Sequence, residues 1–279
     1  MSYASLLVNL NLGQSNRTTL AVAQRLAERL DAVVMGMAGG HPSEMVYADG
    51  YSGDDVYALE RTTTERLLRE AHEEFLSVFP DTGDGHGNGS GWRATGKFES
   101  VTEFAARQAR RADLLITGVP IGAFPNAARA ADTSDLILQA GRPVLVVPAG
   151  CEVSALDWVL VAWKDTREAR RAVADALPML VRARHVQLVE IASDKDHQAA
   201  QSRLDDVAAW LARHEVGAET TVVLANPDDP DQLGALATEL GADLVVAGAY
   251  GHSRLREWAL GGVTRSLLQG LQRCSLLSH

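Results

Sequence analysis

The chain contains few of the residues that several classes of protein need. Its 279 residues include only two cysteines, Cys151 and Cys274, which cannot build a disulfide framework or a zinc site of four thiolates. Aromatic residues make up 5%, no block of lysine and arginine occurs, and the formal net charge is −10. The chain therefore lacks the basic grooves and stacking rings of a general nucleic-acid binder, and we expect no nucleic-acid partner.

Long apolar runs and processing signals are also missing from the sequence. No stretch approaches the roughly 20 apolar residues that span a bilayer, and no basic leader precedes the short apolar run at the N-terminus. The eight histidines form neither HxxxH nor HExxH, and no GxSxG motif occurs. We therefore expect a cytoplasmic protein with no membrane partner, no metal site and no catalytic residues.

What the sequence does contain is an alternation of short apolar runs with longer amphipathic stretches. Runs such as DLLITG at 113–118 and PVLVV at 143–147 predict buried strands, and helical spacing of apolar residues predicts helices such as 54–79. Five strands with four crossovers predict a parallel sheet covered by helices on both faces. After a break at 148–157 the same order of elements starts again.

An internal repeat supports this division. ADLLITG at 112–118 matches ADLVVAG at 242–248, and DLILQAGRPVLVVP in the first half lies over SLLQGLQRCSLLSH in the second. The period of about 130 residues is too long for a solenoid and indicates two copies of one domain. The fold class we predict is α/β, with two tandem five-stranded parallel-sheet domains (flavodoxin-like or adenine nucleotide alpha hydrolase-like) at residues 1–149 and 150–279.

The stretch from Gly248 to Thr264 is the most informative for function, because it begins where a predicted strand ends. Ligands of open parallel sheets bind beyond the carboxyl ends of the strands. Gly248 and Gly251 would let the backbone approach a ligand closely. The next helix opens with free N–H groups and a hydroxyl that would favour an anion, from Gly261, Gly262, Val263 and Thr264. The pattern indicates a phosphate cradle, although glycines also occur in plain turns and helix caps.

The spacing Gly248-x2-Gly251-x9-Gly261 resembles the nucleotide-binding signature of the universal stress protein (UspA-like) family. VLVAWKDTREARRAV at 159–173 resembles that family's first strand and following helix. The resemblance covers almost the whole chain as two tandem copies. It implies a stress-response regulator that binds ATP, with or without Mg²⁺, and not a metabolic enzyme.

The resemblance also implies which residues hold the nucleotide. Ala162 and Lys164 would flank it, and Ile191 would face the adenine. The ribose and phosphates would be held by Gly248, Gly251, Gly261, Gly262, Val263 and Thr264. Domains of the family pair through their last strands, so residues 143–147 and 274–278 are the expected contact strands. The chain would then be a monomer with an intramolecular pseudo-dimer, or a weak homodimer.

Several positions depart from the family pattern. Gly262 stands where the family usually has Ser, Thr or Asn, and Lys164 stands where it usually has Asp. Lys164 could pair with a phosphate or could remove a ribose contact. The first repeat departs further, with Ile121, Ala130 and Ala131 in place of glycines and Asp132 where a phosphate would lie. We therefore expect that the first repeat does not bind ATP, and a different ligand in its cleft stays open.

Two other functions stay open beside the nucleotide-responsive regulator. The departures at Gly262 and Lys164 favour a nucleotide-independent tandem scaffold that acts through contacts with unknown protein partners. An enzyme of the wider adenylate-forming group would need a catalytic base or a second substrate pocket, and the sequence indicates neither. GWRATGK at 91–97 fits GxxxxGK, but it contains a predicted strand and Phe98 follows it, so we expect no P-loop there.

Overall fold

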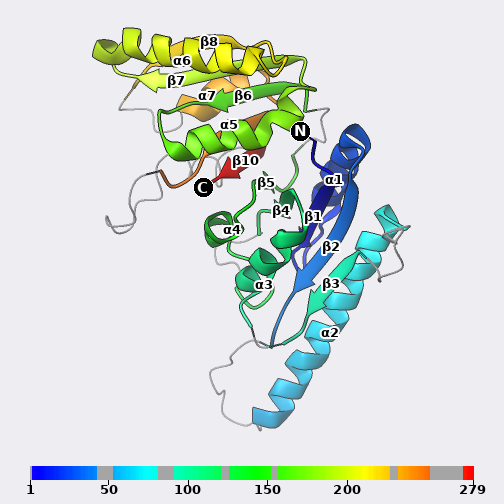
Figure 1. Cartoon of the computed structure of the whole chain (residues 1–279). Coiled ribbons are helices and arrows are strands. Elements are labelled where there is room, and N and C mark those ends of the chain that lie inside the picture. The colour runs from blue at the N-terminus through cyan, green and yellow to red at the C-terminus, as the bar shows by residue number, and fades with distance from the viewer. Residues whose placement is uncertain are drawn as a thin grey trace. The chain divides into compact units, whose positions relative to one another are not determined.

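The computed structural model of the chain describes residues 2–42, 53–80, 91–97, 99–120, 126–151, 156–226, 232–251 and 273–279. Strands and helices alternate along it (Figure 1). The chain divides into two compact units, a first unit of Tyr3–Arg142 and a second unit of Pro143–His279 together with Met1–Ser2. Each unit contains a sheet covered by helices, so the predicted α/β class is confirmed.

The first unit contains a parallel sheet in the order β3-β2-β1-β4. Gly36 of β2 faces Phe75 of α2, whereas Gly39 faces Val101 and Phe104 of α3. Because side chains alternate along a strand, these two helices cover opposite faces of the sheet. The elements of the unit are β1 (Ser5–Leu10), α1 (Arg17–Leu30), β2 (Val33–Gly39), α2 (Gly53–Val78), β3 (Trp92–Thr95), α3 (Val101–Gln108), a 3₁₀ turn (Ala109–Arg111), β4 (Leu114–Gly118) and α4 (Thr133–Gln139).

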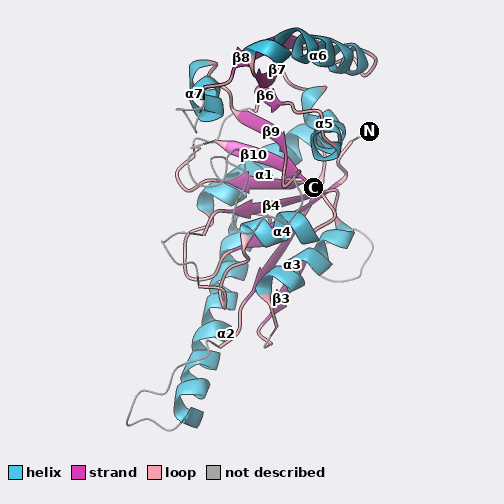
Figure 2. Ribbon diagram, turned by 90° about the vertical axis from the view of Figure 1, so that its left-hand side faces the viewer, coloured by secondary structure: helices cyan, strands magenta, loops and turns pink. Residues whose placement is uncertain are grey.

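The described residues of the second unit form six strands in the order β5-β10-β9-β6-β7-β8, all parallel except β5. Helices α5 and α6 cover one face of its sheet, and α7 lies on the other face (Figure 2). Its elements are β5 (Val144–Val147), β6 (Trp158–Ala162), α5 (Arg167–Leu180), β7 (His185–Ala192), a 3₁₀ turn (Asp194–Asp196), α6 (His197–Ala212), β8 (Glu219–Leu224), α7 (Gln232–Glu239), β9 (Leu244–Gly248) and β10 (Cys274–Ser278).

The two predicted contact strands do pair, because β5 runs antiparallel to β10 with Ser275 opposite Val146. This pairing groups β5 with the second unit, so the units divide between Arg142 and Pro143. The boundary at 149/150 separates two sequence repeats and stays a prediction. The stretch 91–97 contains β3, as predicted, and therefore lacks the strand-loop-helix order of a P-loop.

The aspartate of the repeated ADL motif has the same structural task in both units. The Asp113 carboxylate accepts hydrogen bonds from the backbone N–H groups of Ala4 and Ser5, at 2.9 and 3.0 Å. The Asp243 carboxylate accepts from the backbone N–H groups of Asp157 and Trp158, both at 3.1 Å. Each aspartate thus fixes the start of the first strand of its repeat, which explains why the motif occurs twice.

Two absences apply to the part of the chain that the structure describes. None of its helices combines the length and the apolar character needed to cross a membrane. None of its clusters of His, Cys, Asp and Glu side chains reaches the three members that would suit a metal ion.

Candidate functional site

The candidate site of the second unit lies where the chain leaves β6 and β9 in opposite directions. From β6 the chain continues to β7, and from β9 it continues to β10 on the other side. Such a reversal opens a crevice at the carboxyl ends of the strands, where ligands of open α/β sheets bind. Ala162 and Ala247 are directly opposite in the two strands, so Ala162 and Lys164 share this edge with Gly248 and Gly251.

The other predicted site residues lie at different places. Ala162 is opposite Val189 of β7, so Ile191 lies two residues further along β7, on the side of β6 away from β9. Ile191 and Ala162 are both half-buried. The four remaining predicted residues, and the helix that they are predicted to open, lie outside the described residues: Gly261, Gly262, Val263 and Thr264.

Gly248 is required by the packing of β9 against α5. A Cβ atom at this position would lie 2.4 Å from the backbone nitrogen of Ala169 and 2.5 Å from the carbonyl carbon of Glu168. These are backbone atoms of the first turn of α5, which cannot move aside as a flexible side chain can. The packing of β9 against α5 thus explains the glycine at position 248 without any bound ligand.

Gly251 lies against a buried carboxylate that the sequence did not indicate as part of the site. A Cβ atom on Gly251 would lie 2.9 Å from Oε2 of Glu168, which is 4% exposed. Burial by itself raises the pKa of Glu168, but hydrogen bonds from Arg167 and from the backbone N–H of Glu168 outweigh it and hold the pKa below its ordinary value. Glu168 is therefore ionised at neutral pH, beside the second glycine of the motif.

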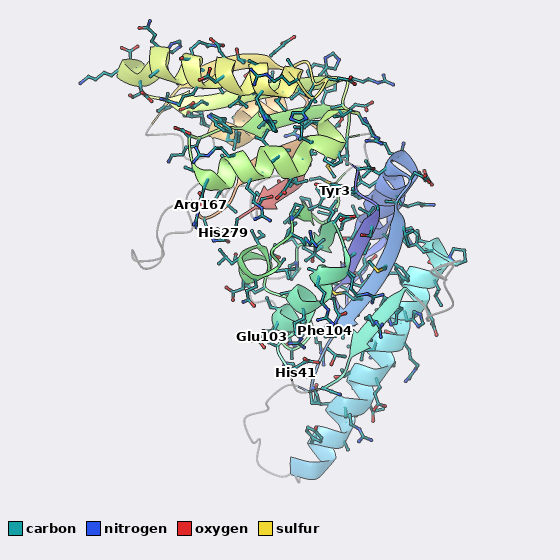
Figure 3. All side chains as sticks on the ribbon, in the orientation of Figure 1. Tyr3, His41, Glu103, Phe104, Arg167 and His279 are labelled. Atoms are coloured by element: carbon teal, nitrogen blue, oxygen red, sulfur yellow. The ribbon has the colours of Figure 1, made fainter. Side chains whose placement is uncertain are left out.

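In the loop that follows β6 and the first turn of α5, Lys164 is a cation that takes part in no ion pair between described residues. Arg167 pairs with Glu168, and Arg170 pairs with Asp165 at 2.6 Å. Lys164 is exposed, and no ion pair between described residues includes it. Figure 3 labels Arg167 at the start of α5 and His279 after β10. Both residues lie near the edge formed by the carboxyl ends of β6 and β9. Because the arginines are already paired, Lys164 is the cation of this loop that can meet a phosphate.

Between the two glycines the backbone adopts a conformation that is uncommon for a large side chain. Tyr250 has a φ of 61°, in the left-handed region that favours glycine. The neighbouring Ala249 donates its N–H to the Ser278 carbonyl at 2.8 Å, which ties this turn to the end of β10. The turn after β9 is thus held in a defined and strained shape.

A separate pocket of about 420 Å³ lies between α5 and α6 of the second unit. Trp163 and Trp210 contribute aromatic surface to it, and the buried indole N–H of Trp163 has no hydrogen-bond partner among the described residues. Neither Gly248 nor Gly251 is among the described residues that line this pocket. Its lining combines these aromatic rings with charged side chains, and it includes Trp163 and Asp165, the two chain neighbours of Lys164.

The corresponding edge of the first unit is occupied by buried amides. Asn11, 1% exposed, donates its side-chain amide to the Gly118 carbonyl at 3.0 Å, and Asn9 donates to the Thr117 hydroxyl at 3.0 Å. The Asp132 carboxylate caps α4 by accepting the N–H of Asp135 at 2.9 Å. A negative charge of the protein itself therefore lies where the phosphate of the second repeat was predicted.

The edge of the first unit is nevertheless not closed. A pocket of about 460 Å³ remains beside the loop that follows β1, and Gln14, Ser15, Asn126 and Arg129 contribute polar groups to it. The alternative raised by the sequence, a ligand other than ATP in this cleft, therefore stays open.

Comparisons with known proteins agree with this fold. The model of the Universal stress protein family matches residues 154–273. A universal stress protein from Archaeoglobus fulgidus DSM 4304 superposes with a TM-score of 0.68 at 14% identity, covering 98% of this chain and 95% of that one. A functionally unknown protein from Pseudomonas aeruginosa PAO1 gives 0.60 at 16% identity, with coverages of 99% and 92%.

At these identities the solved structures show a shared fold and nothing further. No curated protein matches the chain in sequence. The family match covers most of the second repeat, and the shared fold extends over nearly the whole chain. The resemblance to the universal stress protein family that the sequence indicates is thus supported by a family-model match over residues 154–273, within the second repeat.

Proposed function

We propose that the second unit binds an adenine nucleotide at the carboxyl ends of β6 and β9, as a stress-response regulator whose bound state changes its contacts with protein partners. The observation that carries the proposal is the meeting of the loop after β6 with the turn after β9. That loop carries Lys164, and that turn carries Gly248 and Gly251. Binding without catalytic turnover is part of the proposal.

Among the described residues of the site, Lys164 is the cation that suits a polyphosphate. Arg167 and Arg170 are paired with carboxylates, so Lys164 supplies the uncompensated positive charge. Arg167 pairs with Glu168 through Oε1, and Gly251 lies against Oε2 of the same carboxylate, so a cation bound together with the nucleotide would add to the positive charge on this side of the site. We therefore expect Lys164 to contact a phosphate, and binding to be stronger with Mg²⁺ than without it.

One observation favours the second candidate, a scaffold that acts without a nucleotide. Both described glycines of the motif have structural partners of their own, the backbone of α5 for Gly248 and the side chain of Glu168 for Gly251. If these contacts are the whole reason for the glycines, the chain acts through protein contacts alone. The two functions predict opposite results with ATP.

Calorimetric titration of the full chain with ATP and Mg²⁺ separates them. We expect saturable binding, weakened about tenfold by Lys164→Ala, which corresponds to about 1.4 kcal/mol. Lys97→Ala is the matched control, because Lys97 is also exposed but lies in the first unit. At about 100 times the dissociation constant, ATP should stabilise the folded protein by about 2.7 kcal/mol, which a thermal unfolding midpoint records.

Each other outcome has a defined meaning. If millimolar ATP gives neither heat nor a shift in the unfolding midpoint, the scaffold function replaces the nucleotide function. Equal weakening by Lys164→Ala and Lys97→Ala would remove Lys164 from the site. Release of many product molecules per chain would show an enzyme, against the proposal.

A further inference from the structure

The only two cysteines of the chain meet inside the second unit. Cys151 and Cys274 are 123 residues apart, yet their Sγ atoms lie 3.7 Å from each other. No disulfide joins them, and both side chains are buried, with 7% of Cys151 and 2% of Cys274 exposed. Two thiols at this separation need only a small approach to form a bond.

The strand pairing and one turn account for this contact. In the antiparallel pair β5–β10, Ser275 lies opposite Val146, which places Cys274 beside the end of β5. After β5 the chain turns back, because the N–H of Cys151 hydrogen-bonds to the Pro148 carbonyl at 3.3 Å and Gly150 adopts a φ of 75°. The turn returns Cys151 to the first residue of β10, so the fold itself juxtaposes the thiols.

We propose that Cys151 and Cys274 form a site of oxidative modification, at which a peroxide converts the two thiols into an intramolecular disulfide. The sulfur of Cys151 attacks hydrogen peroxide, the O–O bond breaks, one water leaves and Cys151 becomes a sulfenic acid. The sulfur of Cys274 then attacks the sulfur of Cys151, the S–S bond forms as the S–O bond breaks, and a second water leaves. The two thiols lose two electrons and two protons, and one peroxide becomes two waters.

The environments of the two thiols set this order of events. Cys151 is the more exposed of the two and is reached first by a small oxidant. The hydrogen bond with Cys151, burial and the charge of Asp243 raise the pKa of Cys274 well above its ordinary value, so Cys274 stays a protonated thiol until a sulfenic acid forms beside it. We therefore expect the reaction to be slower than at an exposed cysteine.

Peptide mapping of the full chain after treatment with hydrogen peroxide tests the proposal. We expect a cross-linked peptide pair containing residues 151 and 274, loss of both thiols in a count under denaturing conditions, and recovery of both after dithiothreitol. The oxidised chain should migrate faster than the reduced chain on a denaturing gel, because the closed loop keeps it more compact. Its unfolding midpoint in urea should rise and return on reduction.

Variants make the test specific. Cys151→Ser and Cys274→Ser should each keep one thiol and show neither the faster migration nor the rise in midpoint. The map of the wild-type chain does not depend on how well these variants fold. A disulfide between two chains would overturn the proposal, and so would a sulfinic acid as the main product. The peroxide treatment is set so that it oxidises the unfolded chain completely, and two intact thiols in the folded chain after this treatment would also overturn the proposal.

Discussion

Asn11 in the first unit and Lys164 in the second occupy one position of the repeated fold. Leu6 lies opposite Leu114 in β4, and Val159 lies opposite Leu244 in β9, where Leu114 and Leu244 are the same residue of the repeated ADL motif. Five residues further on, the first unit has Asn11 and the second has Lys164. The first side chain is 1% exposed and the second is exposed to solvent.

The side chains at these two equivalent positions differ in their hydrogen bonds and in their exposure. Asn11 joins the ends of β1 and β4 by donating to the Gly118 carbonyl, which makes this edge part of the core of the unit. Lys164, by contrast, is exposed to solvent, and no hydrogen bond between described residues ties its side chain to β9. The same position of the repeated fold therefore carries a buried structural amide in the first unit and a solvent-exposed cation in the second.

The largest effect that we expect from a single substitution is at Gly248. Gly248→Ala places a Cβ atom within 2.4 Å of the backbone of α5, so β9 and α5 must move apart, and the free energy of unfolding should fall by about 3 kcal/mol. Gly217→Ala is the matched control, because its added Cβ would meet no atom within 4 Å, and it should cost under about 0.5 kcal/mol. Urea unfolding measures both. Equal losses would show that the close contact does not exist.

A smaller effect should separate the two equivalent positions. Asn11→Ala leaves the buried Gly118 carbonyl without its side-chain donor, so the free energy of unfolding should fall by about 2 kcal/mol. Lys164→Ala, at the same position of the other repeat, should leave stability within about 0.5 kcal/mol while it weakens ATP binding. The pair of variants is measured by urea unfolding without nucleotide. A large loss from Lys164→Ala would mean that the two positions share a structural role.

The smallest effect that we expect is on the pH dependence of the unfolding free energy. One carboxylate in each unit is compared. The pKa of Glu168 is lowered from 4.5, and so is that of Glu99, where the first cause is the hydrogen bond from Thr95. A carboxyl group with a lowered folded-state pKa contributes stability above pH 4.5 and loses it as the pH falls through the folded value. Below about pH 4.5 the difference in unfolding free energy between the wild type and Glu168→Gln should therefore shrink.

Glu99→Gln should show the same trend, because its pKa is shifted in the same direction. Unfolding by urea at a series of pH values between neutral and acid measures the two differences. A difference that stays constant with pH for Glu168→Gln would mean that Glu168 is not held ionised beside Gly251.

Most strands could be predicted from the sequence because each is a short apolar run between polar segments. DLLITG and DLVVAG are buried at nearly every position, so their burial and their place in a parallel sheet follow from composition alone. The antiparallel contact of β5 with β10 required the resemblance to a family, because nothing within VLVV or CSLLS specifies a partner strand.

The candidate site could be predicted only in part. The glycines and Lys164 follow a recognisable spacing, but Glu168 lies in the run TREARR, which is typical of a solvent-exposed start of a helix. Its burial depends on the approach of Gly251, which is 83 positions further along the chain. The local signal was a glutamate one residue before Ala169, the first apolar residue of an amphipathic helix, and this signal does not specify what covers the carboxylate.

The antiparallel pairing of β5 with β10 has a consequence for any attempt to express the second repeat alone. A fragment that begins at residue 156, where the structure again describes the chain after β5, would leave β10 with an unpaired row of backbone N–H and C=O groups. Unpaired sheet edges of this kind recruit other strands, and an antiparallel partner related by a two-fold axis is the simplest one available. Such a fragment should therefore form dimers through β10. In the intact chain, β5 supplies the strand that a second molecule would otherwise provide.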